Sequence, residues 1–73
     1  AFVVYPNPAS NTLHLEGDFG YGQVSIFDLT GKKVYQGDYQ HEISVGNLNN
    51  GMYLLNIITE EGQVINQKFI IEK

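Results

Sequence analysis

Short runs of β-branched and aromatic residues recur along the whole chain, and clusters of glycine, asparagine and proline separate them. No segment keeps apolar residues at the three-to-four-residue spacing of an amphipathic helix over a useful length. Runs spaced about eight to twelve residues apart are typical of antiparallel β-sandwiches. We therefore predict an all-β chain with an immunoglobulin-like antiparallel sandwich of about seven strands.

The expected strands are short, and the last two carry apolar side chains on both faces. Strands of that kind either lie centrally, with loops over the second face, or turn part of that face toward a partner. The alternation predicts strands at 2–5, 12–16, 23–29, 32–36, 43–45, 52–59 and 64–72, with polar loops at 17–22 and 37–42.

Glycine-containing segments mark the turns between these strands. The clearest hairpin signal is "LTGK" at 29–32, because Gly31 stands where the backbone needs a positive φ. A dense cluster of turn formers, "GNLNNG" at 46–51, ends at Gly51, and "EEGQ" at 60–63 closes the last hairpin. We expect both Gly31 and Gly51 to have structural roles in their turns.

The size and charge of the chain exclude several functions. Its 73 residues make one domain at most, and it has no cysteine for a disulfide or a thiolate metal site. Four lysines, no arginine and a net charge of −4 exclude nucleic-acid binding and disfavour an anionic lipid surface. The chain begins at Ala1 and has no signal peptide, so we expect it to be a piece of a longer protein.

No set of residues predicts catalysis, a cofactor or a metal. The two histidines, His14 and His41, fall in different segments, and no cysteine completes a zinc site. The acidic loops offer only two carboxylates each, fewer than a calcium site needs. No serine sits in a nucleophile elbow, so we predict a protein that is not an enzyme.

Tyrosines leave a second interpretation open. Tyr21 and Tyr39 fall in the expected loops, where aromatic faces can stack on sugar rings. Tyrosine is also a common half-buried strand residue in small β domains. The alternative prediction is therefore a small, non-catalytic carbohydrate- or protein-binding module of an extracellular enzyme.

Both prolines of the chain lie within "YPNPAS" at 5–10. Pro6 and Pro8 fix φ and remove two backbone donors, and they push Tyr5 and Asn7 toward extended conformations. The Asn7 side chain is expected to hydrogen-bond the backbone that follows it. The segment is predicted to be a stiff bend that cannot be an interior strand.

Four stretches in order along the chain resemble one family. "YPNPAS", "VSIFDLTGKKVY", "LNNGMYLLNI" and a final "KFIIEK" are similar to the C-terminal sorting domain of the type IX secretion system in Bacteroidetes, in its type A version. The resemblance covers essentially the whole chain. It implies that residues 1–73 are the C-terminal sorting module of a larger secreted cargo, with the same seven-stranded sandwich fold.

The resemblance implies a targeting function without catalysis or cofactors. The folded domain would be recognised in the periplasm and pass with its cargo through the outer-membrane translocon. A cell-surface sortase would remove it and join the cargo to lipopolysaccharide. The implied partners are the translocon, shuttle and sortase components, and the cargo would end at the cell surface or be secreted.

The resemblance also places partner recognition at the chain end. A final strand at a sheet edge offers unpaired backbone groups to which a partner strand can add, although a closing strand that only fills the core is an equal alternative for Phe69 and Ile71. The same exposed edges make an edge-strand dimer possible in isolation. The residues mapped to recognition are Lys68, Phe69, Ile70, Ile71, Glu72 and Lys73.

The other motif residues are expected to be structural. Gly31 and Lys32 follow the mid-domain hairpin of the family, and Gly51 and Tyr53 follow its later strand. Tyr53 is predicted to pack in the core with its hydroxyl at the edge. Lys32 is predicted to be solvated beside the turn, with contact to the secretion machinery as the alternative.

Overall fold

A computed structural model describes residues 3–17 and 22–73, and this part of the chain contains seven strands. The all-β prediction is confirmed, and every predicted strand has a counterpart within a few residues of its expected position. The strands are β1 (Val3–Tyr5), β2 (Thr12–Glu16), β3 (Gly22–Phe27), β4 (Lys33–Asp38), β5 (Glu42–Ser44), β6 (Gly51–Thr59) and β7 (Val64–Ile71).

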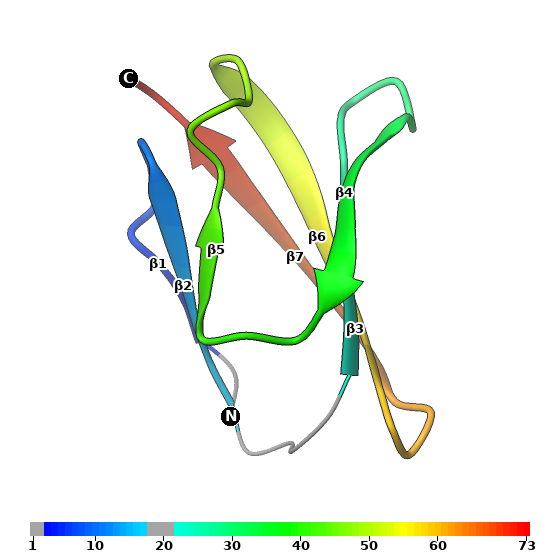
Figure 1. Ribbon diagram of the computed structural model, residues 1–73. Helices are drawn as coiled ribbons and strands as arrows, with labels where there is room; N and C mark the ends of the chain where they lie inside the picture. The colour runs from blue at the N-terminus through cyan, green and yellow to red at the C-terminus, as the bar shows by residue number, and fades with distance from the viewer. Residues whose placement is uncertain (1–2, 18–21) are drawn as a thin grey trace.

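The strands form two antiparallel sheets that face each other (Figure 1). The smaller sheet has the order β1-β2-β5, and the larger sheet has the order β4-β3-β6-β7. The longest pairing joins β6 to β7, from Gly51 opposite Ile71 to Ile58 opposite Val64. Because β7 lies at an edge of the larger sheet, the end of the chain belongs to the sandwich and does not trail away from it.

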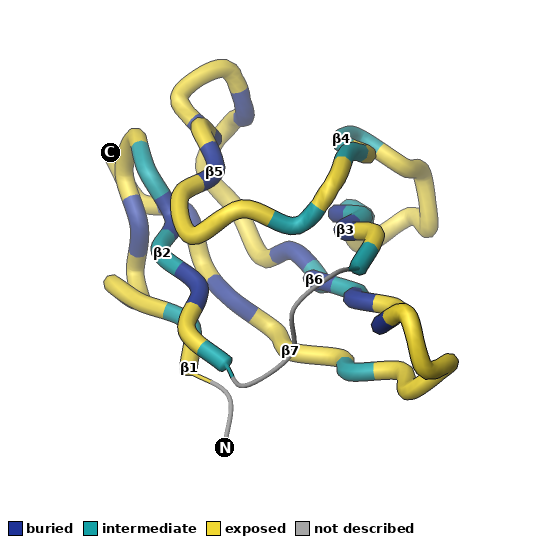
Figure 2. The backbone as a smooth tube through the Cα atoms, turned by 60° about the horizontal axis from the view of Figure 1, so that its bottom comes forward, coloured by how far each residue is buried: buried dark blue, intermediate teal, exposed yellow. Residues whose placement is uncertain are grey.

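Strict alternation of side chains along the strands builds the core. In β6, Tyr53, Leu55 and Ile57 are buried, while Met52 and Ile58 point to the opposite face and are exposed. Figure 2 shows buried positions alternating with exposed ones along the facing strands of the two sheets. The largest fully buried side chains are Phe69, Leu13, Leu15, Ile26, Ile43, Leu55, Ile57, Ile71, Val24 and Val45.

Burial of these side chains is the main stabilising term, since each contributes about 1.5–3 kcal/mol relative to an exposed position. The one buried polar side chain among the described residues, Thr59, accepts a hydrogen bond from the Gln63 backbone N–H at 3.0 Å. Within the part of the chain that the structure describes, no buried side-chain polar atom lacks a partner.

Two of the expected loops differ from the structure. The loop at 37–42 is shorter than predicted, because β4 continues to Asp38, which pairs with Gln23. The Tyr35 side chain lies over Gly37, where a Cβ would come within 2.9 Å of the tyrosine hydroxyl. Of the loop predicted at 17–22, positions 18–21 lie outside the described residues, and Gly22 is already the first residue of β3.

The β3–β4 turn is held by one carboxylate. Asp28 Oδ1 accepts hydrogen bonds from the Thr30 N–H at 2.9 Å, the Thr30 hydroxyl at 2.6 Å and the Lys32 N–H at 3.0 Å. Gly31 has φ +86° and Gly51 has φ +153°, conformations that L side chains rarely adopt. Both glycines therefore have the structural roles that the sequence predicts.

Candidate recognition site at the chain end

The tail, defined here as residues 68–73, alternates between the core and the surface. Phe69 and Ile71 are each 1% exposed and point between the sheets. Ile70 is 42% exposed, and Lys68, Glu72 and Lys73 are also exposed. The tail is thus partly a closing strand and partly a surface.

A segment from the start of the chain holds the outer edge of the tail. The Asn7 side-chain Oδ1 accepts a hydrogen bond from the Ile70 N–H at 3.0 Å. The Ala9 N–H donates to the Ile70 carbonyl at 2.8 Å, and the Glu72 N–H donates to the Ala9 carbonyl at 2.8 Å. We call residues 7–9 the brace, because they fix the backbone of the tail on its open side.

The brace corrects two sequence-based expectations. Asn7 bonds a residue 63 positions away, whereas its own following backbone was the expected partner. The N–H and C=O of Ile70 and the N–H of Glu72 already have hydrogen-bond partners in the brace. The prediction of an open edge is therefore wrong at these positions. Ala9, a residue that sequence reasoning did not single out, is fully buried and pairs with Ile71.

The open part of the β7 edge lies before the brace. Backbone groups of successive residues in a strand point to alternate sides, and those of Ile70 point away from β6. By the same alternation, Asn66 and Lys68 present their backbone groups outward. Among the described residues, the only bond to them is from the Gln67 side chain to the Lys68 carbonyl, at 3.2 Å.

The loop at 46–51 holds the last residue from the other side. The Lys73 N–H donates to Asn50 Oδ1 at 3.0 Å, and Lys73 Nζ donates to the Gly46 carbonyl at 2.6 Å. Tyr53 is 7% exposed, and its hydroxyl donates to the Asn49 carbonyl at 2.7 Å. The prediction that Tyr53 packs in the core with its hydroxyl at the edge is therefore confirmed.

Aromatic contacts tie the motif residues to the two sheets. The Tyr53 ring stacks on Phe69 with 5.8 Å between centroids, and Tyr5 stacks on His14 at 5.1 Å. Pro6 and Pro8 are exposed on either side of Asn7, and the peptide bonds that precede both prolines are cis. Together with the brace, these contacts place the first motif, at 5–10, beside the tail.

The mid-domain turn lies apart from the brace but shares a hollow with the tail. Lys32 is exposed there, as the sequence predicts. A surface hollow of about 290 Å³ is lined by Gly31 and Leu29 of the turn, by Phe27 and Leu54 of the sheet, and by Lys68 of the tail. Lys68 is therefore the tail residue that lies near the turn.

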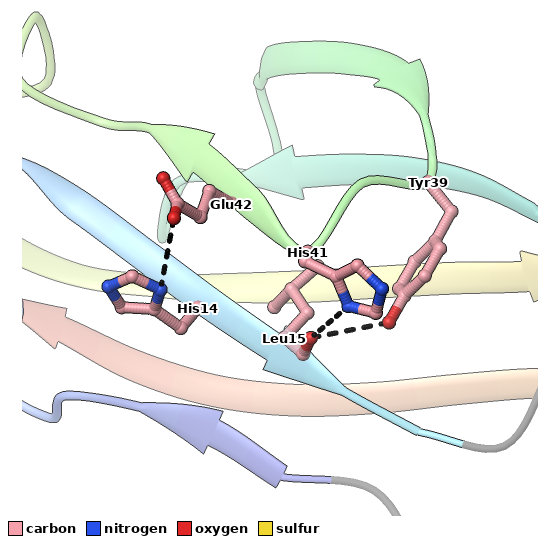
Figure 3. Close-up of polar contacts among 5 residues, drawn as sticks. All are labelled: His14, Leu15, Tyr39, His41 and Glu42. Atoms are coloured by element: carbon pink, nitrogen blue, oxygen red, sulfur yellow. Dashed lines mark hydrogen bonds and ion pairs between the residues drawn. The ribbon is translucent and has the colours of Figure 1, made fainter.

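The histidines have separate partners (Figure 3). His14 Nδ1 lies 4.0 Å from Glu42 Oε2, whereas His41 Nδ1 lies 3.4 Å from the Leu15 carbonyl, which also accepts a bond from the Tyr39 hydroxyl at 3.3 Å. No cluster of three or more His, Asp or Glu side chains suited to a metal occurs in the described ranges 3–17 and 22–73.

Of the two tyrosines in the alternative sugar-binding interpretation, the structure describes Tyr39 and not Tyr21. Tyr39 is half-buried against the core, and its ring meets His41 edge-on at 5.8 Å. Burial, with a smaller contribution from the Glu16 carboxylate, raises the pKa of the Tyr39 hydroxyl above its ordinary value of 10.0. Tyr21 lies outside the described residues.

These features define a small, two-sheet β-sandwich module whose chain end is braced on the surface. In the described part of the chain, no helix is long and apolar enough to cross a membrane. The model of the family described as "Secretion system C-terminal sorting domain" matches residues 3–72. The chain therefore belongs to this family, the C-terminal sorting domains of type IX secretion, which are non-catalytic signal modules.

The family assignment confirms the resemblance to the type IX sorting domains, and the type A version stays a prediction. No protein among the curated sequences matches the chain. Membership implies interaction with the type IX machinery and delivery of a cargo to the cell surface or the exterior. The function of the domain is thus a C-terminal sorting signal.

Proposed function

We propose that the domain is a type A sorting signal at the C-terminus of a larger cargo, and that the machinery reads the braced tail. The shuttle and the outer-membrane translocon recognise the folded domain in the periplasm and export it with the cargo. A cell-surface sortase then removes the domain and attaches the cargo to lipopolysaccharide. The observation that supports recognition of a folded tail is the set of three brace bonds to Ile70 and Glu72, at 2.8–3.0 Å.

The braced geometry limits how a partner can read the tail. Since the brace occupies the backbone edge at Ile70 and Glu72, recognition there uses the exposed side chains of Lys68, Ile70, Glu72 and Lys73. A partner strand can add to β7 before the brace, where residues such as Asn66 and Lys68 present their backbone groups outward. Phe69 and Ile71 contribute by holding the strand in the core.

The test is export of a periplasmic reporter fused in front of residues 1–73 in a type IX-competent host. Deleting Phe69 to Lys73 is a poor variant, because it removes two core side chains together with the surface. The better variant is Ile70→Ser with Lys73→Glu, which changes only exposed side chains. We expect this variant to fold and to leave most of the reporter in the periplasm.

The matched control is Ile58→Ser with Lys33→Glu, which makes the same two types of change at exposed positions outside residues 68–73. We expect the control to be exported normally. Normal export of the tail variant would remove the tail side chains from recognition. Cleavage and attachment are tested separately in a sortase-deficient host, where the account predicts that exported reporter keeps the domain and lacks lipopolysaccharide.

A further inference from the structure

The outer face of the larger sheet, which points away from the core, carries charge of opposite sign at its two ends. The register of the four strands arranges this face in rows that run across the sheet. The first row contains Lys33, Phe27, Leu54 and Lys68, from β4 to β7. The third row contains Asp38, Gln23, Ile58 and Val64.

The row between them is polar and uncharged, with Gln36, Ser25, Asn56 and Asn66 in the same strand order. The Asn56 and Asn66 side chains bond each other at 2.7 Å. One end of the face is therefore basic, the middle consists of amides and a hydroxyl, and the other end is acidic. Glu60, which follows β6, lies beside Asp38 at the acidic end, on the rim of one hollow.

The lysines of the basic end have no carboxylate partner within the described part of the chain. Lys33 Nζ donates to Gln36 Oε1 at 3.1 Å and lies 5.9 Å from the centre of the Phe27 ring. Lys68 lines the hollow of about 290 Å³ beside Phe27 and Leu54. At the acidic end, the Asp38 carboxylate accepts a bond from the Gln23 side chain at 2.8 Å, and Asp38 lines a second hollow of about 450 Å³.

Apolar side chains are exposed at both ends of the same face. Ile58 and Val64 are 47% and 55% exposed at the acidic end, and Met52 is 40% exposed beyond the basic row. Leu29, at the tip of the β3–β4 turn, is 76% exposed. Water-exposed apolar groups beside uncompensated charges are typical of a surface that meets a partner.

We infer that this face binds a second copy of the chain, face to face, about a twofold axis that runs along the polar middle row. A twofold axis between two facing sheets can run along the strands or across them. An axis along the strands would place the lysine row of one copy against the lysine row of the other. An axis across the strands lays each strand on its own copy in the opposite direction, so Lys33 of one copy faces Asp38 of the other, and Lys68 faces Val64. The pairing of Lys33 with Asp38 therefore selects this arrangement.

The middle row and the two central strands also fit this arrangement. On the axis, the amide row meets itself, and amides both donate and accept hydrogen bonds. On either side, Phe27 and Leu54 of one copy meet Gln23 and Ile58 of the other, which covers apolar surface at both ends. The brace and the buried side chains of the tail lie outside the contact, so the dimer is compatible with a folded chain end.

The available area predicts a weak, reversible dimer. The four strands lie about 4.8 Å apart and contain six (β4), six (β3), nine (β6) and eight (β7) residues of about 3.4 Å each, which gives a face of roughly 500 Å² per copy. The total of roughly 1,000 Å² is at the low end for a specific protein interface. We therefore expect association in the range from about 10 μM to about 1 mM.

The experiment is sedimentation velocity of the whole chain over that concentration range, with variants that reverse one end of the face. Lys33→Glu with Lys68→Glu makes both ends acidic, and Asp38→Lys with Glu60→Lys makes both ends basic. Each variant alone is expected to associate at least about tenfold more weakly than the unmodified chain, because like charges face each other. An equimolar mixture of the two is expected to recover the dimer.

The control mixture pairs Lys33→Glu/Lys68→Glu with Glu16→Lys/Glu42→Lys. The latter has the same net charge as Asp38→Lys/Glu60→Lys, but its changes lie on the smaller sheet. We expect this mixture to stay monomeric. If a double variant unfolds by circular dichroism, the single reversals Lys33→Glu and Asp38→Lys, which change the facing pair, replace it.

Three outcomes would overturn the inference. The unmodified chain could remain monomeric up to about 1 mM. Association could persist undiminished in both reversed variants, which would place it at the strand edges. The control mixture could associate as well as the complementary one, which would show attraction between net charges without use of the face.

Discussion

Asn7 joins two segments that are 63 residues apart in the chain, through its Oδ1 and the Ile70 N–H. The prolines on either side remove competing backbone donors, so the brace contributes its side-chain oxygen and the Ala9 backbone. A side-chain acceptor in this position fixes the edge of β7 without adding another strand. This residue therefore connects the start of the sequence pattern to its end.

The first prediction concerns this hydrogen bond. Asn7→Ala removes the acceptor and should lower the free energy of unfolding by about 0.5–1.5 kcal/mol. Asn7→Asp keeps an oxygen at the same position and should cost less. Urea denaturation of the three proteins provides the comparison, and equal stability of Asn7→Ala and the unmodified chain would show that the bond is not significant.

The second prediction concerns Asp28 and acid. The hydrogen bond from the Thr30 hydroxyl, followed by the backbone bonds from Lys32 and Thr30, lowers the pKa of the Asp28 carboxyl below its ordinary value of 3.8. Because the folded-state pKa is depressed, its stabilising effect is present above the unfolded-state pKa and is lost as the pH falls through the folded-state pKa.

Asp28→Asn keeps the Oδ1 acceptor but cannot titrate, so its melting temperature should fall less steeply below about pH 4 than that of the unmodified chain. An NMR titration of the side-chain carboxyl provides the direct measurement. A midpoint at or above 3.8 would contradict the role of the turn bonds.

The residue roles that the sequence could predict are those that depend on neighbouring residues in the chain. Gly31 lies in a turn and Gly51 at the point where a turn-rich loop enters β6, both with positive φ, and the burial of Tyr53 follows from the alternation of its strand. The partner of Asn7 depends on how two distant segments meet, which no local pattern encodes. The same holds for Ala9, which is fully buried and pairs with the distant residue Ile71.

At the scale of elements, β7 contributes to both the core and the surface, because successive side chains of a strand point to opposite faces. The odd positions Phe69 and Ile71 are buried, and the even positions Lys68 and Ile70 face outward. For Phe69 and Ile71 the sequence leaves core filling and partner recognition as equal alternatives, and the structure places both side chains in the core. The sequence did not predict that a segment before β2 would occupy the outer edge, because "YPNPAS" has no strand pattern of its own.

The third prediction separates the core role of β7 from its surface role. Phe69→Ala should cost about 3–5 kcal/mol, a large share of the stability of a small domain. Ile70→Ala, at the neighbouring exposed position, should change stability by no more than about 0.5 kcal/mol. Thermal or urea unfolding distinguishes them, and a similar cost for both would mean that the alternation does not divide core from surface.

Boundaries were the least predictable part of the elements. The polar composition of 37–42 suggested a loop, but Gly37 and Asp38 pair with Val24 and Gln23 in the extended β4. The backbone register of β3 and the Tyr39 N–H bond to the Gly22 carbonyl at 2.8 Å override the loop-like composition. Cross-strand pairing is a tertiary effect that composition alone does not report.

At the scale of the whole molecule, two facing sheets form the core without a disulfide, since the chain has no cysteine. The chain end closes this sandwich and is held by the brace on one side and the loop at 46–51 on the other. The family assignment makes the domain a sorting signal for type IX secretion. The central claim is that this signal is read with its tail folded onto the brace.

The most direct test locks the tail in place. Ala9 and Ile71 are bridge partners, so their Cα atoms are on the order of 5 Å apart, a separation that a disulfide spans. With Ala9→Cys and Ile71→Cys introduced into a cysteine-free chain, the oxidising periplasm should join them.

The measurement is the fraction of a fused reporter that the oxidised double variant exports, compared with each single cysteine variant. The account predicts that the locked domain is exported as efficiently as the single variants, because the machinery reads the tail as it lies. Retention of the locked domain in the periplasm, with normal export of both single variants, would show that the tail must leave the brace and would contradict the account.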